Sequence, residues 1–307
     1  MKALFPVSLA ALVLASPVAR AQRFQQEAIV VYHEDKFERV WIADASKTQY
    51  LYYETEAGVD SKRQGISKPQ AIWLMEPAAY TAAMEQFQGR HYEEALKGFQ
   101  VVREEYQALI ELPDNHSSLA AFYSMECLRK LGRYDELEKA LADFQPDDRN
   151  SLTREFQQKQ IELYAMWGAV QAKSWERVES LAKGHLENNK LPGYQRAQAG
   201  YCLGLALEAL NRPLEALDGY NIAFTADAGA SEVVAALAAE NSMKLYLQDP
   251  EVIRAKKVFG TSDENPNSVG NARLREAAAV AKLYEAALGN GAKLSGELAE
   301  LPKFAKE

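Results

Sequence analysis

The stretch Gly89-Arg-His-Tyr92-Glu-Glu-Ala95-Leu-Lys-Gly-Phe99 decides how most of this chain folds. It begins with a glycine, which accepts the backbone conformations of tight turns. Apolar residues then recur at three- and four-residue spacing, which places Tyr92, Ala95 and Phe99 on one face of a helix. The stretch therefore predicts that one helix ends near Gly89, the chain turns, and a second helix begins.

The same pattern returns, with gradual divergence, along the rest of the chain. Its copies are Gly132-Arg-Tyr134, Lys173-Ser-Trp175, Asn211-Arg-Pro213 and Gln248-Asp-Pro250. The small or aliphatic position of the second helix recurs at steps of 42, 41, 38 and 37 residues, at Ala95, Leu137, Val178, Ala216 and Ile253. One helical hairpin cannot bury its apolar face alone, whereas stacked hairpins bury a continuous core between neighbours. The repetition predicts a mainly α fold, with about five hairpins in residues 77–290.

These copies resemble the tetratricopeptide (TPR) repeat, whose turn carries a small residue followed two positions later by an aromatic. Gly132-Arg-Tyr134 matches that turn, and Gly204 lies twelve residues before Ala216, where the family has a small residue in its first helix. The period is longer than the family's roughly 34 residues, and Met125 and Met166 occupy the small-residue position, so the repeats are divergent. HEAT-like helix pairs, with periods of about 40 or more, are the alternative architecture. The resemblance covers about two thirds of the chain and implies a TPR-like solenoid without catalytic residues.

Residues 22–76 have a different pattern, rich in β-branched and aromatic residues. Short runs of strand formers occur at 28–32, 39–43, 48–55 and 71–75, with a polar loop at 58–69. They predict a small antiparallel β module, in which Trp41, Trp73 and several tyrosines fill the core. Tyr50 and Tyr52 share one strand face, and if exposed they would offer a surface for stacking on a sugar.

The first 21 residues have the pattern of a signal peptide. Lys2 precedes an apolar run at 3–15, and Ala19-Arg20-Ala21 places small residues three and one before a cleavage site. We expect cleavage before Gln22 and export to a periplasmic, cell-surface or secreted location. The alternative, a membrane anchor, requires a longer apolar run. No later segment approaches membrane length.

The end of the chain is expected to close the array. An amphipathic helix at 271–288 ends at Gly289-Asn290-Gly291 and would cap the last hairpin. Residues 291–307 are expected to form a loose polar tail.

Composition and motifs argue against several classes of function. The formal net charge is −8, from 35 basic and 43 acidic residues, whereas nucleic-acid binding needs clustered Lys and Arg. The four histidines lack metal-ligand spacing, and there is no phosphate loop or nucleophile elbow. The acidic pairs Glu93-Glu94 and Asp147-Asp148 are expected to be surface charges, and Cys127 and Cys202 to be small buried residues. We therefore expect no catalytic site, metal or cofactor.

The remaining candidate is the concave groove, which the first helix of each hairpin lines in TPR-like arrays. Residues placed on or near that side are Tyr80, Phe122, Arg129, Trp167, Tyr201 and Glu208. Trp167 and Arg129 are expected to be exposed partner contacts, since Trp and Arg are enriched at binding hot spots. The competing interpretation is that these side chains fill the contacts between hairpins. The sequence thus predicts an exported, non-catalytic scaffold that binds a protein or peptide, with carbohydrate or surface-polymer binding through the tyrosine-rich β module as the alternative.

Overall fold

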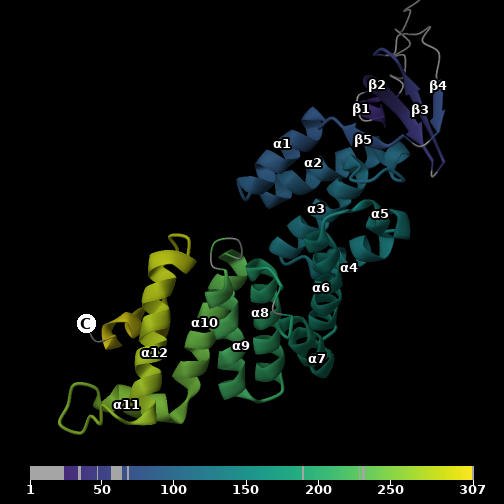
Figure 1. The fold of residues 1–307 in the computed structure, drawn as a ribbon. Helices are drawn as coiled ribbons and strands as arrows, with labels where there is room; N and C mark the ends of the chain where they lie inside the picture. Colours follow the sequence, from purple (N-terminus) through teal and green to yellow (C-terminus); the bar gives the residue numbers. More distant parts are fainter. Residues whose placement is uncertain are drawn as a thin grey trace, which may run out of the picture. The chain divides into compact units, whose positions relative to one another are not determined.

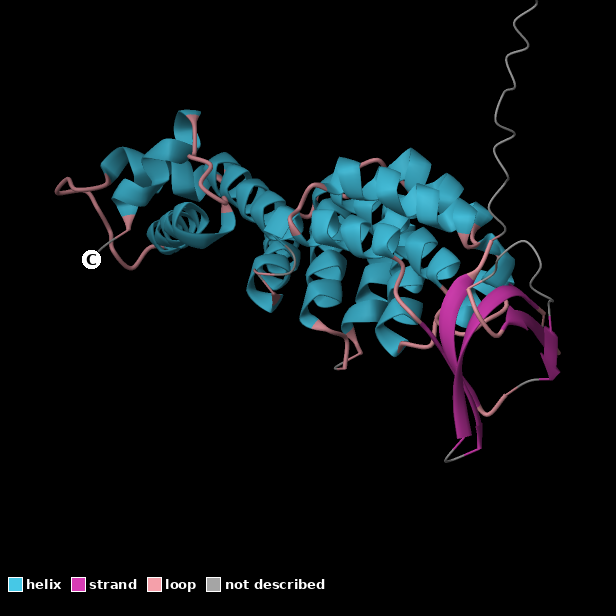
Figure 2. Cartoon of the chain, turned by 90° about the horizontal axis from the view of Figure 1, so that it is seen from above, coloured by secondary structure: helices cyan, strands magenta, loops and turns pink. Residues whose placement is uncertain are grey.

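The computed structural model describes residues 24–33, 36–46, 48–56, 64–67, 69–188, 190–227, 229 and 232–305. This part of the chain is mainly helical, with a small antiparallel sheet at its N-terminal end (Figures 1 and 2). It divides into a sheet unit that ends at Met75 and a helical unit that begins at Glu76. The expected signal peptide, residues 1–21, lies outside the described residues.

The described strands form one sheet in the order β4-β3-β2-β1-β5. They are β1 (Gln26–His33), β2 (Lys36–Ala45), β3 (Gln49–Tyr53), β4 (Gln64–Ser67) and β5 (Ala71–Leu74). Four of them match the predicted strands, but β4 lies in the stretch expected to be a polar loop. Its sequence, Gln-Gly-Ile-Ser, has no clear apolar alternation, and its strand conformation comes from antiparallel pairing with β3.

The two faces of the sheet differ in burial. Ala28 and Val30 of β1 and Val40 and Ile42 of β2 are buried, as the two-residue period requires for one face. Trp73 pairs with Ile29, which faces the other side, and is 59% exposed. The prediction that Trp73 fills the core is therefore wrong.

The helical unit consists of antiparallel hairpins followed by a final helix. Its α-helices are α1 (Ala78–Gln88), α2 (Tyr92–Glu105), α3 (His116–Lys130), α4 (Tyr134–Asp143), α5 (Pro146–Ser151), α6 (Glu155–Gln171), α7 (Trp175–Leu186), α8 (Gly193–Ala209), α9 (Pro213–Ala226), α10 (Glu232–Gln248), α11 (Pro250–Val258) and α12 (Val269–Leu283). A 3-10 turn at Gln107–Leu109, a π-helical turn at Tyr284–Leu288 and a 3-10 helix at Gly296–Phe304 complete it. Each second helix packs both on its own first helix and on the first helix of the next hairpin (Figure 1).

Four of the turns inside hairpins share one backbone geometry. The residues with positive φ are Arg90 (65°), Gly132 (70°), Lys173 (52°) and Asn211 (60°), and a second helix begins two residues after each of them. The residue after each donates its N–H to the carbonyl five residues earlier, at 2.8–3.0 Å, which closes the first helix with a 6→1 bond. Arg90, not Gly89, is thus the equivalent of Gly132, since each lies two positions before the residue that begins the second helix. The fifth turn differs, because Asp249 caps α11 through its side chain instead.

Substituting Gly132 by alanine is expected to destabilise the helical unit by about 1 kcal/mol, because an L-residue at a φ of +70° is strained. Gly184, inside α7, provides the matched control, since an added Cβ meets open space at both positions. Gly184→Ala is expected to stabilise by about 0.5–1 kcal/mol, through helix propensity. Urea midpoints that shift in the same direction for both variants would contradict the assigned turn.

Successive first helices run in the same direction. Tyr80 and Phe87 of α1 contact His116 and Tyr123 of α3, with ring centroids 5.0 and 5.4 Å apart. Both contacts join residues 36 positions apart, so residue numbers rise together along the two helices. A similar separation, of 38 residues, joins α3 to α6 and α6 to α8. The hydrogen bonds are between Glu126 and Tyr164 and between Gln160 and Gln198.

Helix α12 departs from this order. The Tyr246 hydroxyl donates to Glu276 at 3.0 Å, and the Tyr284 hydroxyl donates to Glu240 at 2.7 Å. Residue numbers therefore fall along α10 as they rise along α12, and the two helices are antiparallel. The prediction of a final helix at 271–288 is confirmed by α12 and the π-helical turn that continues it.

The prediction of a loose tail is wrong for residues 296–304. These residues form a 3-10 helix that packs on α12, with Leu301 and Phe304 buried. The Phe304 ring lies edge-on against Phe259, with centroids 5.0 Å apart. Apolar side chains that bury area against a helix order this segment despite its polar composition.

Candidate functional site

Most of the predicted partner residues are buried. Tyr80, Phe122, Arg129, Trp167 and Tyr201 all belong to the core, and only Glu208 is exposed. Trp167 is 1% and Arg129 is 7% exposed, so the prediction that they are exposed contacts is wrong. The first helix of an internal hairpin is covered by its own partner and by both neighbouring hairpins, which leaves little of it open.

Arg129 is held in a buried ion pair. Its Nε and Nη2 donate to the two carboxylate oxygens of Glu126, at 3.1 and 2.8 Å, and the Tyr164 hydroxyl donates to Glu126 at 2.6 Å. Burial acts to raise the pKa of Glu126, but the charge and hydrogen bonds of Arg129 and the bond from Tyr164 outweigh it, so this pKa is lowered. The Arg129–Glu126 pair lies within α3, and the bond from Tyr164 to the Glu126 carboxylate joins this helix to α6 inside the molecule.

Trp167 has a similar internal role. Its indole N–H donates to Gln198 at 2.9 Å, and its ring stacks on Tyr134, with centroids 4.9 Å apart and an interplanar angle of 13°. The side-chain amides of Gln160 and Gln198 also bond each other reciprocally at 3.0 Å. A buried polar row thus connects α6 to α8, beside an aromatic row that continues to Tyr201.

Tyr80 and Glu208 complete the predicted set. Tyr80 lies against Phe99 and His116, and burial raises its pKa. The same burial lowers the pKa of His116 to about 4. Glu208 accepts a hydrogen bond from Tyr220 at 2.6 Å, which ties α8 to α9. The structure gives these residues internal partners and does not bring them together in one open groove.

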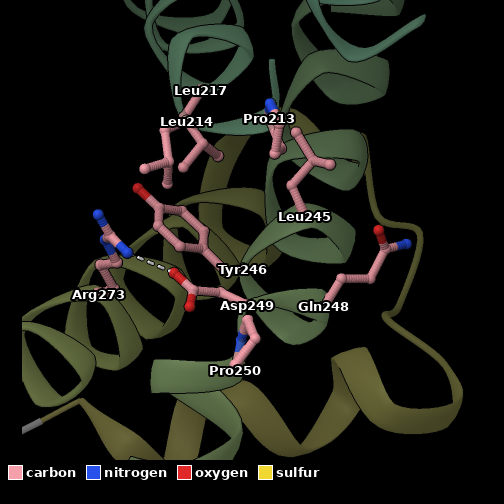
Figure 3. Close-up of a pocket in the computed structure, with 9 residues that line it drawn as sticks. All are labelled: Pro213, Leu214, Leu217, Leu245, Tyr246, Gln248, Asp249, Pro250 and Arg273. Atoms are coloured by element: carbon pink, nitrogen blue, oxygen red, sulfur yellow. Dashed lines mark hydrogen bonds and ion pairs between the residues drawn. The ribbon is translucent and has the colours of Figure 1, made fainter. Parts of the chain in front are cut away.

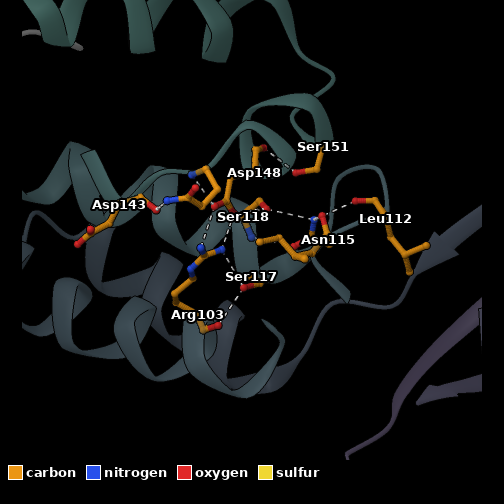
Figure 4. Close-up of polar contacts among 10 residues, drawn as sticks. Arg103, Leu112, Asn115, Ser117, Ser118, Asp143, Asp148 and Ser151 are labelled. Carbon is orange, nitrogen blue, oxygen red and sulfur yellow. Dashed lines mark hydrogen bonds and ion pairs between the residues drawn. The ribbon is translucent and has the colours of Figure 1, made fainter. Parts of the chain in front are cut away.

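Asp148 is the centre of a polar cluster that the sequence analysis missed (Figure 4). Its side chain is fully buried, which corrects the expectation of a surface charge. Arg103 donates to both carboxylate oxygens, Ser118 donates at 2.7 Å, and the Gln145 N–H donates at 3.1 Å. The cluster joins α2, α3 and α5. Helix α5 does not correspond to any position of the repeat. In the sequence, only the capping pattern formed by Gln145 and Asp148 indicates that a helix begins there.

An open pocket of about 310 Å³ lies where α9, α10, α11 and α12 meet (Figure 3). It is lined by Pro213, Leu214, Leu217, Leu245, Tyr246, Gln248, Asp249, Pro250 and Arg273. Leu214 is 51% exposed, although it is a large apolar side chain. Arg273 donates to Asp249 at 2.6 Å, so an ion pair lies beside the apolar wall. An apolar wall with a few placed polar groups is the usual character of a ligand pocket.

The sheet unit also has an open face. Cross-strand pairing places Arg39, Ile29 and Trp73 in one row and Phe37, Val31 and Ala71 in the next. Phe37 is 67% exposed, and Trp73 lies on the same face. Tyr50, Tyr52 and Tyr53 are buried instead. The exposed aromatic residues of this unit are therefore not the tyrosines that the sequence analysis singled out.

The described residues contain no group of three or more His, Cys, Asp or Glu side chains that could hold a metal ion. Cys127 and Cys202 are free and buried, as predicted, and burial raises the pKa of Cys127 to about 12. None of the described helices combines the length and apolar character needed to cross a membrane. Comparisons of the chain with protein-family models, with curated proteins and with solved structures gave no match.

Proposed function

We propose that this chain is an exported, non-catalytic scaffold of TPR-like hairpins that binds a segment of a protein partner. The four equivalent turns and the parallel first helices support the architecture. The close packing of α8 on α9 also supports this architecture. Gly204 lies at the small-residue position of the TPR pattern, and a Cβ there would overlap the Tyr220 ring. Export rests on the sequence pattern of residues 1–21.

The pocket between α9 and α12 is the observation that carries the proposal. Five of the six groove residues expected to make contact are buried, whereas Leu214 presents an exposed apolar side chain beside the Arg273–Asp249 pair. A cavity of this size fits one aliphatic or aromatic side chain of a peptide. The charged pair at its edge is mostly buried; Arg273 can donate to a carbonyl of the peptide backbone and Asp249 can accept from a backbone N–H.

Substituting Leu214 by aspartate is expected to lower peptide affinity at least about tenfold, because it places a charge in an apolar contact. The probes are peptides selected from a random display library on the purified protein, and binding is measured by fluorescence anisotropy. Leu237→Asp is the matched control, since Leu237 is 38% exposed on α10 and does not line the pocket. We expect selected peptides to share one large apolar residue. Equal affinities for the two variants would reject this pocket as the site.

Carbohydrate or surface-polymer binding through the sheet unit is the second candidate. The observation that favours it is the exposure of Phe37 and Trp73 on one sheet face, because exposed aromatic rings can stack on apolar ligand faces. Co-sedimentation with insoluble polysaccharides tests it. Retention that is lost in Trp73→Ala but kept in Leu214→Asp would favour this candidate over peptide binding.

A further inference from the structure

A second cavity, of about 310 Å³, lies in the first half of the helical unit and is separate from the α9–α12 pocket. One stripe of side chains from each of α2, α3 and α4 lines this groove. The residues are Leu96, Gln100, Arg103, Ala121, Ser124, Leu128, Ala140, Asp143 and Phe144. Small side chains on α3 and α4 leave the space open, and larger apolar side chains form its walls.

The floor of the groove contains a polar group that the fold leaves unused. Ser124 is only 9% exposed, and its hydroxyl has no hydrogen-bond partner within the described part of the chain. A serine inside a helix commonly donates a hydrogen bond from its hydroxyl to the backbone carbonyl four residues earlier, but Ser124 does not. A buried hydroxyl without a partner costs free energy, which a ligand that supplies a donor or acceptor would recover.

The part of the chain that forms the groove is rich in acidic residues. Residues 76–148 contain 15 Asp and Glu against 7 Lys and Arg. The guanidinium of Arg103, the one basic group in the lining, is already bound to Asp148. No hydrogen bond or ion pair to the Asp143 carboxylate is present among the described residues. The groove thus offers an unpaired negative charge beside apolar walls.

We propose that this groove binds a segment of a partner protein that presents an aliphatic side chain next to a lysine or arginine. The aliphatic side chain packs against Leu96, Leu128 and Phe144, as the apolar walls require. A polar group of the segment bonds the Ser124 hydroxyl, and the cation lies near Asp143. This site shares no lining residue with the α9–α12 pocket, so a negative result at one site does not reject the other.

Methyl NMR of the full-length mature chain tests the proposal. The probes are three acetylated and amidated tetrapeptides: Ala-Leu-Lys-Ala, Ala-Leu-Glu-Ala and Ala-Ala-Lys-Ala. With labelled alanine and leucine methyl groups, the reporters in the groove are Leu96, Ala121, Leu128 and Ala140, and those in the other pocket are Leu214, Leu217 and Leu245. We expect the first peptide to shift the groove methyls and to bind at least about fivefold more tightly than the other two.

Two substitutions in the groove test the roles of its polar groups. Asp143→Asn is expected to weaken binding of Ala-Leu-Lys-Ala about fivefold and to reduce its salt dependence. Ser124→Ala is expected to weaken binding about threefold while leaving the fold at least as stable, because it removes an unpaired hydroxyl. Glu94→Gln, on the exposed first turn of α2, is the control and should change affinity less than about twofold. The proposal is overturned if the peptide with glutamate binds equally well, if only the Leu214, Leu217 and Leu245 methyls shift, or if neither groove variant weakens binding.

Discussion

Replacing Asp148 by alanine is expected to lower the free energy of unfolding of the helical unit by about 3–5 kcal/mol. Arg103 would keep a mostly buried guanidinium without its counter-ion, since only 23% of that side chain is exposed. Ser118 and the Gln145 N–H would lose the acceptor that they now share. Urea unfolding followed by circular dichroism measures the loss, and thermal unfolding should show a midpoint roughly 6–20 °C lower.

Two further variants identify the cause of that loss. Asp263→Ala removes a carboxylate from an exposed loop, and its effect should remain within about 0.5 kcal/mol. The double substitution Arg103→Met with Asp148→Leu removes both charges and should recover part of the stability, because no ion is then left buried alone. A wild-type midpoint for Asp148→Ala would show that the cluster contributes nothing to stability.

Replacing Arg129 by methionine is expected to cost a similar amount, about 3–5 kcal/mol near pH 7. The aliphatic replacement retains much of the packing, so the main effect is that Glu126 stays buried with Tyr164 as its remaining hydrogen-bond partner. The Glu126→Leu/Arg129→Met double variant should be clearly more stable than the single variant. If the single variant unfolds like the wild type, the Arg129–Glu126 pair does not contribute to the stability of the helical unit.

The pH dependence of the Arg129→Met deficit provides an independent check. The pKa of Glu126 is lowered in the folded wild type, so the stability from this pair is complete above the unfolded pKa of about 4.3 and is lost as the pH falls through the folded value. In Arg129→Met the largest opposing influence is gone, and burial should raise the pKa of Glu126 instead. The stability difference between wild type and variant should therefore shrink between pH 7 and pH 4. A constant difference would mean that Glu126 is not the group responsible.

The hairpin turns were predictable because their chemistry is local. Tyr92, Tyr134, Trp175 and Pro213 each begin a second helix, as the repeated stretch indicates. A positive φ, a 6→1 hydrogen bond and an aromatic or proline residue two positions later involve only neighbours in the sequence. Even so, the turn residue of the first copy was misplaced by one position, because arginine gives no sign that it adopts the conformation that glycine favours.

The burial of individual side chains was not predictable in the same way. Trp167 and Arg129 lie on the helices that the pattern assigns, but those helices are covered on most sides, and the pattern does not distinguish a groove from an interior. The partners of Asp148, Arg103 and Ser118, are distant in sequence, whereas Arg129 pairs with Glu126 of its own helix and is buried by the helices packed around it. From a sequence pattern alone, charged residues are expected to be exposed. They are buried only where the folded structure supplies a partner, which the pattern does not show.

The reversed direction of α12 limits how this protein can be lengthened. An additional hairpin duplicated between α7 and α8 would lie between the parallel first helices α6 and α8 and could continue the existing offset between them. A hairpin added after α11 would instead have to displace α12 and break both tyrosine–glutamate bonds that join it to α10. Gains or losses of repeats, in evolution or by design, should therefore be tolerated in the middle of the array and rejected at α12.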